Sequence, residues 1–295
     1  RQMCIRDRYY EGLIQNFPKA SPAALAEAHF LLGRAAFDQG DFKSSISHMA
    51  EAKTLDPQKY GEQVNVLSVL SYHKLQDVNK LKEALETLQK ENPSAVARVP
   101  DVIPAWLGLQ AYGMKDLETA DKYMTWATQN DQLQNVKKVI WRNLAKVRLA
   151  LKKYDRALVA SNNFLKDEDQ PYRRADGMLD KASILLGLGK YADARKTAEE
   201  ALALGVEGPL MASLKIVLGD ISYAEKKFDE AAKHYGVTAE LFVNDAELKP
   251  KALFKAAEAL DKAGRKSEAS QYRARLQKEF PDWKQDDESL PPDAR

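Results

Sequence analysis

The sequence predicts an all-α fold of about seven stacked antiparallel helix pairs, on the strength of three observations. A short motif recurs with a period of about 37 residues. Between its copies, apolar residues follow the i, i+3, i+4 spacing of amphipathic helices. No segment shows the sustained alternation of apolar and polar residues that marks a strand. The 295 residues are therefore expected to form a modular array rather than one globular domain.

The recurring motif is a Phe, Tyr or Leu followed three residues later by a small residue. Four copies lie 37 residues apart, and they begin at Leu117, Tyr154, Tyr191 and Phe228. Each is followed at the third position by Ala, and Ala269 continues the series. The upstream copies are Phe42 with Ser45 and Leu81 with Ala84.

Each period contains two helices joined by a short turn. In the first unit, residues 26–39 have helical spacing, Gly40 and Asp41 interrupt it, and residues 43–55 resume it. Proline is tolerated in the first turn of a helix because its missing N–H costs little there. Prolines at predicted helix boundaries are Pro22, Pro57, Pro93, Pro209, Pro250 and Pro281.

The small residue of the motif has a predicted packing role. We expect the two helices of a pair to approach most closely at this residue, because a larger side chain would hold them apart. The predicted close-contact positions are Ala120, Ala157, Ala194, Ala231 and Ala269.

These positions resemble the tetratricopeptide repeat family, whose pattern is W-x2-L-G-x2-Y followed by Ala, an aromatic residue, Ala and Pro. The Leu-Gly pair recurs at residues 32–33, 107–108 and 218–219, and Trp141 with Leu144 matches the Trp and Leu. The second-helix spacing is kept by Ser45, Met49, Ala52 and Pro57, and again by Ala231 and Tyr235. The resemblance covers about residues 22–281 and implies a right-handed α-solenoid, although residues 59–93 match poorly.

The resemblance divides the chain into seven two-helix repeats. The expected boundaries are 22–58, 59–96 (a degenerate repeat), 101–134, 135–168, 171–206, 208–244 and 247–281. Residues 9–21 are expected to be the remnant of a truncated preceding repeat, residues 1–8 a non-native leader, and residues 282–295 a disordered tail. The chain is therefore expected to be the C-terminal part of a longer protein.

A narrower resemblance concerns the cellular setting. Residues 15–21 (QNFPKAS) and 28–33 (AHFLLG) resemble repeat proteins of Gram-negative envelopes that assist outer-membrane assembly and the Tol-Pal system. This implies a bacterial origin and favours the periplasm or cell envelope, with the cytoplasm as the alternative. The single cysteine, Cys4, lies outside the repeats, and no apolar run approaches the ~18 residues of a membrane span.

The residue types that commonly act in catalysis or bind metals show no spacing that is typical of an active site or a metal site. The four histidines, His29, His48, His73 and His234, lack metal-ligand spacing. Residues 187–190 (GLGK) resemble a phosphate loop only superficially, because Tyr191 stands where a Ser or Thr is needed. No nucleophile lies in a recognisable motif beside a base. The sequence therefore predicts no enzyme activity, no cofactor and no metal.

Charge points to no particular class of partner. The 45 basic and 43 acidic residues are interspersed and leave a net charge of +2. Basic pairs such as Lys137-Lys138 and Lys226-Lys227 fall near predicted helix ends, where solvated cations are common. Neither nucleic-acid binding nor direct membrane insertion is expected.

The resemblance implies that the first helices of the pairs line a concave groove. Projected onto this sequence, the groove carries Phe30, Arg34 and Phe37; Val69, His73 and Gln76; Ala105, Leu109 and Tyr112; Arg142, Lys146 and Leu149; Leu179, Ser183 and Leu186; Ile216, Asp220 and Tyr223; and Phe254, Glu258 and Asp261. The candidate partner-binding residues chosen from this set are Phe30, Arg34, Phe37, His73, Leu109, Tyr112, Arg142, Lys146, Ser183, Asp220, Tyr223, Phe254 and Glu258. Arg142 and Lys146 share a face and could clamp an acidic group, although plain surface charge is the simpler interpretation.

The sequence thus predicts a scaffold that binds a protein or peptide in this groove. The alternative is an array that regulates an upstream enzyme domain or presents substrates to it. No motif specifies the partner or the oligomeric state.

Overall fold

The computed structural model describes residues 5–16, 19–129, 134–241 and 246–285. Within these ranges the chain forms fifteen α-helices and one 3₁₀ helix, and no strand. The all-α prediction is therefore confirmed. The chain divides into two compact units, unit 1 (Arg1–Leu133) and unit 2 (Gln134–Arg295).

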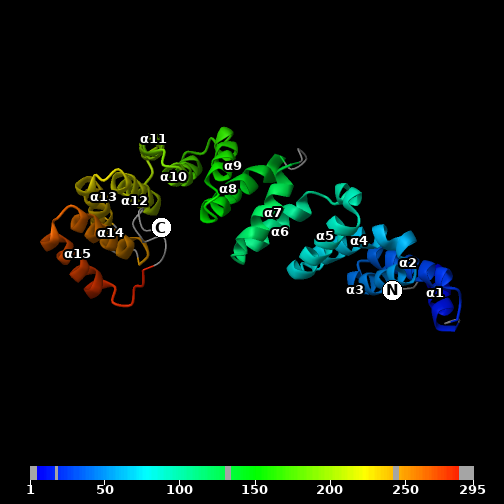
Figure 1. Ribbon diagram of the computed structural model, residues 1–295. Coiled ribbons are helices and arrows are strands. Elements are labelled where there is room, and N and C mark those ends of the chain that lie inside the picture. The colour runs from blue at the N-terminus through cyan, green and yellow to red at the C-terminus, as the bar shows by residue number, and fades with distance from the viewer. Residues whose placement is uncertain (1–4, 17–18, 130–133, 242–245, 286–295) are drawn as a thin grey trace. The chain divides into compact units, whose positions relative to one another are not determined.

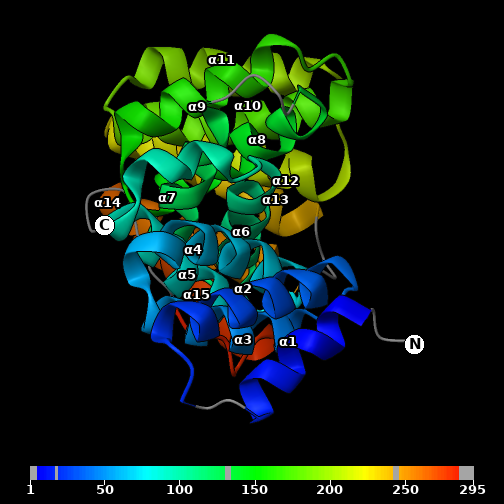
Figure 2. The ribbon, with the colours of Figure 1, turned by 90° about the vertical axis from the view of Figure 1, so that its right-hand side faces the viewer.

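Unit 1 begins with α1, which packs on α2 ahead of three helix pairs (Figure 1). Its elements are α1 (Ile5–Asn16), α2 (Pro22–Asp38), α3 (Phe42–Leu55), α4 (Pro57–Lys74), α5 (Val78–Glu91), the 3₁₀ helix η1 (Pro93–Arg98), α6 (Val102–Gly113) and α7 (Leu117–Thr128). In each pair we call the first helix the A helix and the second the B helix. Figure 2 shows one such pair, α2 and α3, side by side.

Unit 2 contains four helix pairs. Its elements are α8 (Gln134–Ala150), α9 (Tyr154–Lys166), α10 (Pro171–Gly187), α11 (Tyr191–Ala203), α12 (Gly208–Ala224), α13 (Phe228–Leu241), α14 (Leu248–Lys262) and α15 (Lys266–Glu279). The A helices α8, α10, α12 and α14 contact one another in succession, and each also packs on its own B helix.

The same turn joins the A and B helices in all seven pairs. The residue before the B-helix N-cap has a positive φ of 56° to 81°, at Gly40, Gln76, Lys115, Lys152, Gly189, Lys226 and Gly264. The next residue donates its N–H to a carbonyl five residues back, as Asp41 does to Ala36 at 2.9 Å. This is the Schellman arrangement that closes helix C-termini. The turn recurs every 36 to 39 residues. Because it is the same in each pair, the A and B helices start from the same register in every repeat.

Side-chain caps begin the B helices of unit 1. The carboxylates of Asp41, Asp77 and Asp116 accept hydrogen bonds from the backbone N–H three residues ahead. Such caps satisfy helix donors that have no partner within the helix. Asp77 heads α5 in the same way as its two counterparts, so the poorly matching residues 59–93 contain an ordinary pair. The one irregularity is η1, which lengthens the spacing from Gln76 to Lys115 to 39 residues.

Small residues allow the helices of a pair to approach closely. Ala120, Ala157, Ala194, Ala231 and Ala269 are all fully buried, as predicted. The facing position on the A helix is small as well: a Cβ added at Gly108 would lie 2.7 Å from Cγ of Met124 and 2.9 Å from its backbone nitrogen. The Leu-Gly pairs of the sequence therefore mark the places where the two helices touch.

The N-terminal end of the chain differs in part from the prediction. Ile5–Arg8 begin α1, so the second half of the predicted leader is helical and continuous with residues 9–16. Residues 1–4 and most of the predicted tail, 286–295, lie outside the described residues. Among the described helices, none is both long enough and apolar enough to cross a membrane.

Candidate functional site

The A helices carry one shared face, defined by the turns. In each A helix we compare the residues that lie 11, 7 and 4 positions before the N-cap of the B helix. They are four and three residues apart, which is close to one helical turn, so they lie on one side of the A helix. We call these positions the A-helix face. In unit 1 they are Phe30, Arg34 and Phe37 on α2, Val66, Leu70 and His73 on α4, and Ala105, Leu109 and Tyr112 on α6.

The second repeat corrects the predicted register. Gln76 has a φ of 56° and forms the turn, so it is not a face residue. Val69 is fully buried in the core between α4 and α5. The prediction was wrong because Val69 stands where the neighbouring repeats have Gly, which left no Leu-Gly pair to align. Val66 and Leu70 hold the face positions instead, and His73 remains on the face one turn further along.

Aromatic rings join successive A helices of unit 1. The ring of Phe30 stacks on that of Tyr60 in α4, with centroids 4.7 Å apart and planes at 26°. His73 of α4 meets Trp106 of α6 edge to face at 5.4 Å. Burial, followed by the charge of Lys74, lowers the pKa of His73, which favours the neutral ring at pH 7. The face is therefore aromatic along the contacts between its helices.

Arg34 is the exposed cation of this face. Among the described residues it has no ion-pair partner. Phe30 and Phe37 lie one turn to either side of it and are half-buried, and Phe37 packs edge to face on Phe42 at 5.4 Å. An accessible guanidinium between aromatic side chains is a combination that recurs at the energetic centres of protein interfaces.

The α6 part of the face is apolar. Leu109 and Tyr112 are both half-buried, as expected of residues that line a surface without filling the core. Met114, which follows α6, is 61% exposed. A thioether side chain adapts to varied apolar partners, because it is unbranched and polarisable.

In unit 2, Arg142 and Lys146 of α8 share a face as predicted, but the acidic groups beside them belong to the chain itself. The guanidinium of Arg142 pairs with the carboxylate of Asp176 on α10. Nζ of Lys146 lies 3.8 Å from Oδ2 of Asp180, also on α10. Burial raises the pKa of Asp180 to about 6, even though Lys146 and Arg142 act in the opposite direction. The two cations thus join α8 to α10.

Asp220 and Tyr223 of α12 are buried, which corrects their assignment as accessible groove residues. They are 4% and 3% exposed. The physical reason is that α10 and α14 both pack on α12 and cover its face. Oδ1 of Asp220 accepts hydrogen bonds from Nζ of Lys255 at 2.8 Å and from the hydroxyl of Tyr235 at 2.6 Å.

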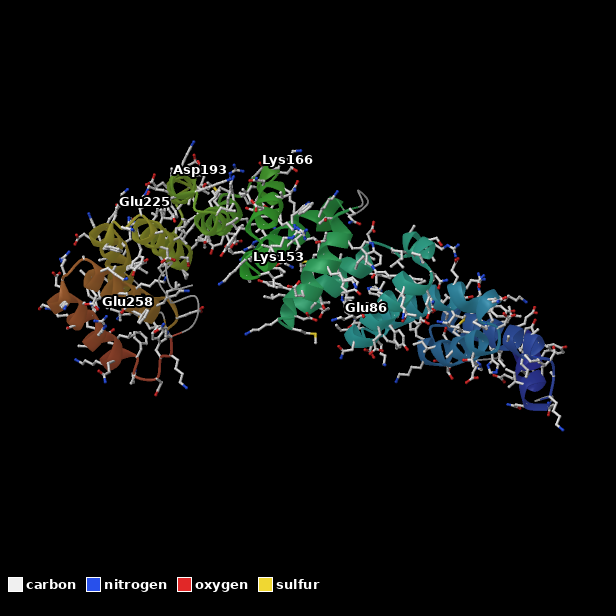
Figure 3. The ribbon with its side chains drawn as sticks, in the orientation of Figure 1. Glu86, Lys153, Lys166, Asp193, Glu225 and Glu258 are labelled. Atoms are coloured by element: carbon white, nitrogen blue, oxygen red, sulfur yellow. The ribbon has the colours of Figure 1, made fainter. Side chains whose placement is uncertain are left out.

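Other predicted residues of unit 2 also have partners within the chain. The ring of Phe254 on α14 contacts that of Trp283, with centroids 5.6 Å apart. The carboxylate of Glu258, labelled in Figure 3, accepts a hydrogen bond from Arg273 of α15 at 2.7 Å. Ser183 of α10 is half-buried and donates to the backbone carbonyl of Leu179 at 3.1 Å.

A polar cleft of about 210 Å³ lies between α4 and α5, away from the A-helix face. It is lined by Asn65, Ser68, Tyr72, Lys80, Glu83, Ala84 and Thr87. The amide of Asn65 donates to Glu91 at 3.0 Å and to Asn92 at 2.7 Å. Its carbonyl accepts from Lys53 at 2.9 Å, so this side chain links α3, α4 and the end of α5. In the described part of the chain, no three His, Cys, Asp or Glu side chains are grouped so that they could hold a metal ion.

The structure therefore separates the predicted residues into two sets. Those of unit 1 gather on the A-helix face of α2, α4 and α6. Those of unit 2 are buried or contact other groups of the chain. The sequence missed two residues of the unit 1 face, Val66 and Leu70, although the cap residue Asp77 could have revealed the register of α4. It also missed Trp106, whose ring packs on the face residue His73.

Family models agree with this architecture. Two models, both described as tetratricopeptide repeat, match residues 8–60 and 179–242, and residues 251–282. Together they account for about half of the chain. No curated protein sequence matches it.

Solved structures similar to this chain share its fold at low sequence identity. The apo form of RapI is 16% identical with a TM-score of 0.54, over 90% of this chain and 79% of that one. A Rap protein complexed with competence and sporulation factor is 13% identical with a TM-score of 0.52, over 88% and 77%. Naa15/Naa10 bound to HypK-THB is 14% identical with a TM-score of 0.55, over 96% of this chain and 41% of that one.

Proposed function

Because the chain belongs to the tetratricopeptide repeat family, we propose that it is an interaction scaffold whose partner, a protein or peptide, binds the A-helix face of unit 1. Stacked helix pairs offer an extended surface of fixed shape, and such surfaces are used for recognition.

One contrast between equivalent positions carries the choice of unit 1. At the middle face position, Arg34 on α2 is exposed and has no ion-pair partner among the described residues. On α8 the equivalent Lys146 faces Asp180, and on α12 the equivalent Asp220 is buried with Lys255. A partner would have to break existing ion pairs to bind these unit 2 residues. The guanidinium of Arg34 can bind an anion without breaking one.

The composition of the face indicates the chemistry of the partner. Half-buried Phe30, Phe37, Leu70 and Leu109 favour an apolar segment, and Arg34 favours a carboxylate among its side chains. The proposed ligand is therefore an apolar peptide segment with one acidic side chain near its N- or C-terminal boundary. The Rap protein and Naa15/Naa10 structures each contain a bound partner, which supports a protein or peptide ligand for the fold.

Photo-crosslinking in the native cell tests the proposal. A photoreactive phenylalanine analogue is introduced at position 34, 70 or 109, and crosslinked proteins are identified by mass spectrometry. The controls place the same analogue at the exposed Lys43 and Lys90 of the B helices α3 and α5. We expect one set of proteins to be captured from all three face positions and from neither control. Equal capture from the controls would show that the A-helix face is not the binding surface.

A charge-reversed variant then tests the role of Arg34. Arg34→Glu is expected to weaken binding of the captured partner about 10-fold or more, because a buried contact to a carboxylate becomes repulsive. Lys43→Glu is the matched control for the same charge change. Equal weakening by both variants would mean that net charge, and not this contact, determines the affinity.

Three further proposals concern the biological setting and the chemistry of the chain. The chain is proposed to be the C-terminal part of a longer bacterial protein of the periplasm or cell envelope, and to have no catalytic activity of its own. The sequence of the complete gene, together with fractionation of the native cells, tests the first two points. Turnover that a single point substitution abolishes would contradict the third.

A further inference from the structure

Two histidines meet where α2 and α3 cross. Nδ1 of His29 on α2 lies 3.1 Å from Nδ1 of His48 on α3. The crossing is close here, since a Cβ added at the neighbouring Gly33 would lie 3.2 Å from Cβ of His48. Neither histidine is on the A-helix face, so the function proposed above does not use them.

The orientation of the rings indicates what holds the pair together. The centroids are 5.3 Å apart and the two Nδ1 atoms 3.1 Å, so the nitrogens lie between the rings and point toward each other. An imidazole nitrogen is either a donor or an acceptor. At this separation one Nδ1–H donates to the other Nδ1, and the pair holds one proton between its rings. When both rings are cationic, each Nδ1 carries a proton, and two N–H groups and two positive charges then lie face to face.

The surroundings favour the neutral pair, which has a single proton between its two Nδ1 atoms. Burial, and then the charge of His48, lower the pKa of His29, while Glu51 of α3 acts in the opposite direction. Burial likewise lowers the pKa of His48, against the carboxylates of Glu11 on α1 and Glu51. The charged groups that act on the pair thus come from α1 and α3. They moderate the effect of burial but do not reverse it.

We propose that His29 and His48 form a pH-sensitive latch, which holds α2 against α3 at neutral pH and loosens this crossing when both rings become protonated. His29 directly precedes Phe30 in α2, and Arg34 follows within the next two turns. Loosening the crossing therefore disturbs the A-helix face of unit 1. This last consequence rests on the proposed function, whereas the latch itself does not.

The direction of the pH dependence follows from the depressed pKa values. The folded pair resists protonation, so the unfolded chain binds more protons once the pH falls below ~6.5, the ordinary value for histidine. The stabilisation from the latch is present above that pH. It is lost progressively as the pH falls toward the folded pKa values.

Nuclear magnetic resonance of the unaltered protein tests the shared proton. Long-range proton–nitrogen spectra of the histidine side chains at pH 7.5 are expected to show one member of the pair as the Nδ1–H tautomer. The other is expected to have an unprotonated Nδ1. Finding both rings with unprotonated Nδ1, or both protonated throughout the range from pH 7.5 to 5.5, would overturn the proposal.

Equilibrium unfolding in urea at pH 7.5, 6.5 and 5.5 tests the latch function. The variants are His29→Gln, His48→Gln and the double variant, with His73→Gln as the control for a lone half-buried histidine. The slope of the unfolding free energy against pH gives the number of protons taken up on unfolding. Near pH 5.5 this number is expected to fall by up to about two in the double variant and by no more than about one in the control. A double variant that keeps the pH dependence of the unaltered chain would refute the latch.

Partner binding separates the latch from the proposed function. If the protein captured at the A-helix face dissociates more readily at pH 5.5 from the unaltered chain than from the double variant, both proposals gain support. If the stability shows the expected pH dependence while capture at positions 34, 70 and 109 fails at every pH, the latch stands and the proposed binding face is wrong.

Discussion

Lys255 and Asp220 form a buried ion pair between successive A helices of unit 2, with 2.8 Å between Nζ and Oδ1. The two residues are 35 positions apart, which is about one repeat period. The hydroxyl of Tyr235 donates to the same Oδ1 at 2.6 Å. Removal of either partner would leave a charge inside the packed stack of α12, α13 and α14.

This arrangement predicts asymmetric effects of single and double substitutions. Asp220→Ala is expected to destabilise unit 2 by about 3–5 kcal/mol, because it removes a buried carboxylate that pairs with the buried Lys255. The combination Asp220→Leu with Lys255→Met should recover most of the loss, because two apolar side chains of similar volume replace the pair. Urea unfolding followed by circular dichroism measures both. A double variant as unstable as Asp220→Ala would mean that packing, and not the broken ion pair, dominates.

Glycine positions predict a second contrast, between α6 and α4. A Cβ at Gly108 would meet the backbone nitrogen of Met124 at 2.9 Å, which cannot move without shifting α7. Gly108→Ala is therefore expected to destabilise the fold by about 1–3 kcal/mol, less the gain in helix propensity. Gly61 lies inside α4, and a Cβ added there would have no atom of another residue within 4 Å apart from its own helix backbone and chain neighbours, so Gly61→Ala should stabilise by about 0.5–1 kcal/mol. Thermal melts that move in the same direction for both variants would contradict the close-approach assignment.

Much of the fold could be predicted because packing and sequence share one period. A residue such as Ala194 has to be small wherever two helices cross, so the requirement returns about every 37 positions and is visible in the sequence. Cross-repeat ion pairs carry the same signal: Lys82 with Asp116 and Glu86 with Lys122 are separated by 34 and 36 positions. The turn at Gly40 was visible in the sequence, but the turns without glycine and η1 could not be predicted in this way. The turns use Gln and Lys as well as Gly at positive φ, and η1 has no counterpart in the other described links.

The candidate site was less predictable, for two physical reasons. One aligned position, Val69, lacked the small residue that marks the crossing, and the face of α4 was displaced as a result. In addition, helical spacing tells which side chains share a face but not what covers that face. Asp220 has the same position in its helix as Arg34, yet one is buried under α14 and the other is exposed. Exposure depends on how tightly successive A helices pack, which no local pattern encodes.

The turn between α12 and α13 predicts a stabilising substitution. Lys226 has a φ of 62°, a conformation that costs a residue with a Cβ about 1–2 kcal/mol. Lys226→Gly removes this strain, but glycine loses more backbone entropy on folding, so the net gain should be about 0.5–1 kcal/mol. At the equivalent Gly189 of the preceding turn, φ is 71°, and Gly189→Ala should lose stability by a similar amount. Urea titrations that show equal stability for the two variants would refute a conformational origin.

The carboxyl of Asp180 predicts a pH-dependent effect of its own. Burial raises its pKa from 3.8 to about 6, so the folded state favours the protonated form. The stabilisation from the neutral carboxyl is fully present below about pH 4 and is lost as the pH rises through about 6. Asp180→Asn keeps a neutral side chain of the same shape. Relative to the unaltered chain, its stability should therefore improve by up to about 3 kcal/mol between pH 4.5 and pH 7.5.

The measurement is a comparison of unfolding free energies at the two pH values, in which titration of all other groups cancels between variant and parent. Asp193→Asn, on the exposed surface of α11 (Figure 3), controls for removal of a carboxylate as such. If Asp180→Asn loses stability at pH 7.5 relative to pH 4.5, the attraction of Lys146 and Arg142 outweighs burial. The ionised carboxylate would then be a stabilising link between α8 and α10, opposite to the sign argued from its raised pKa.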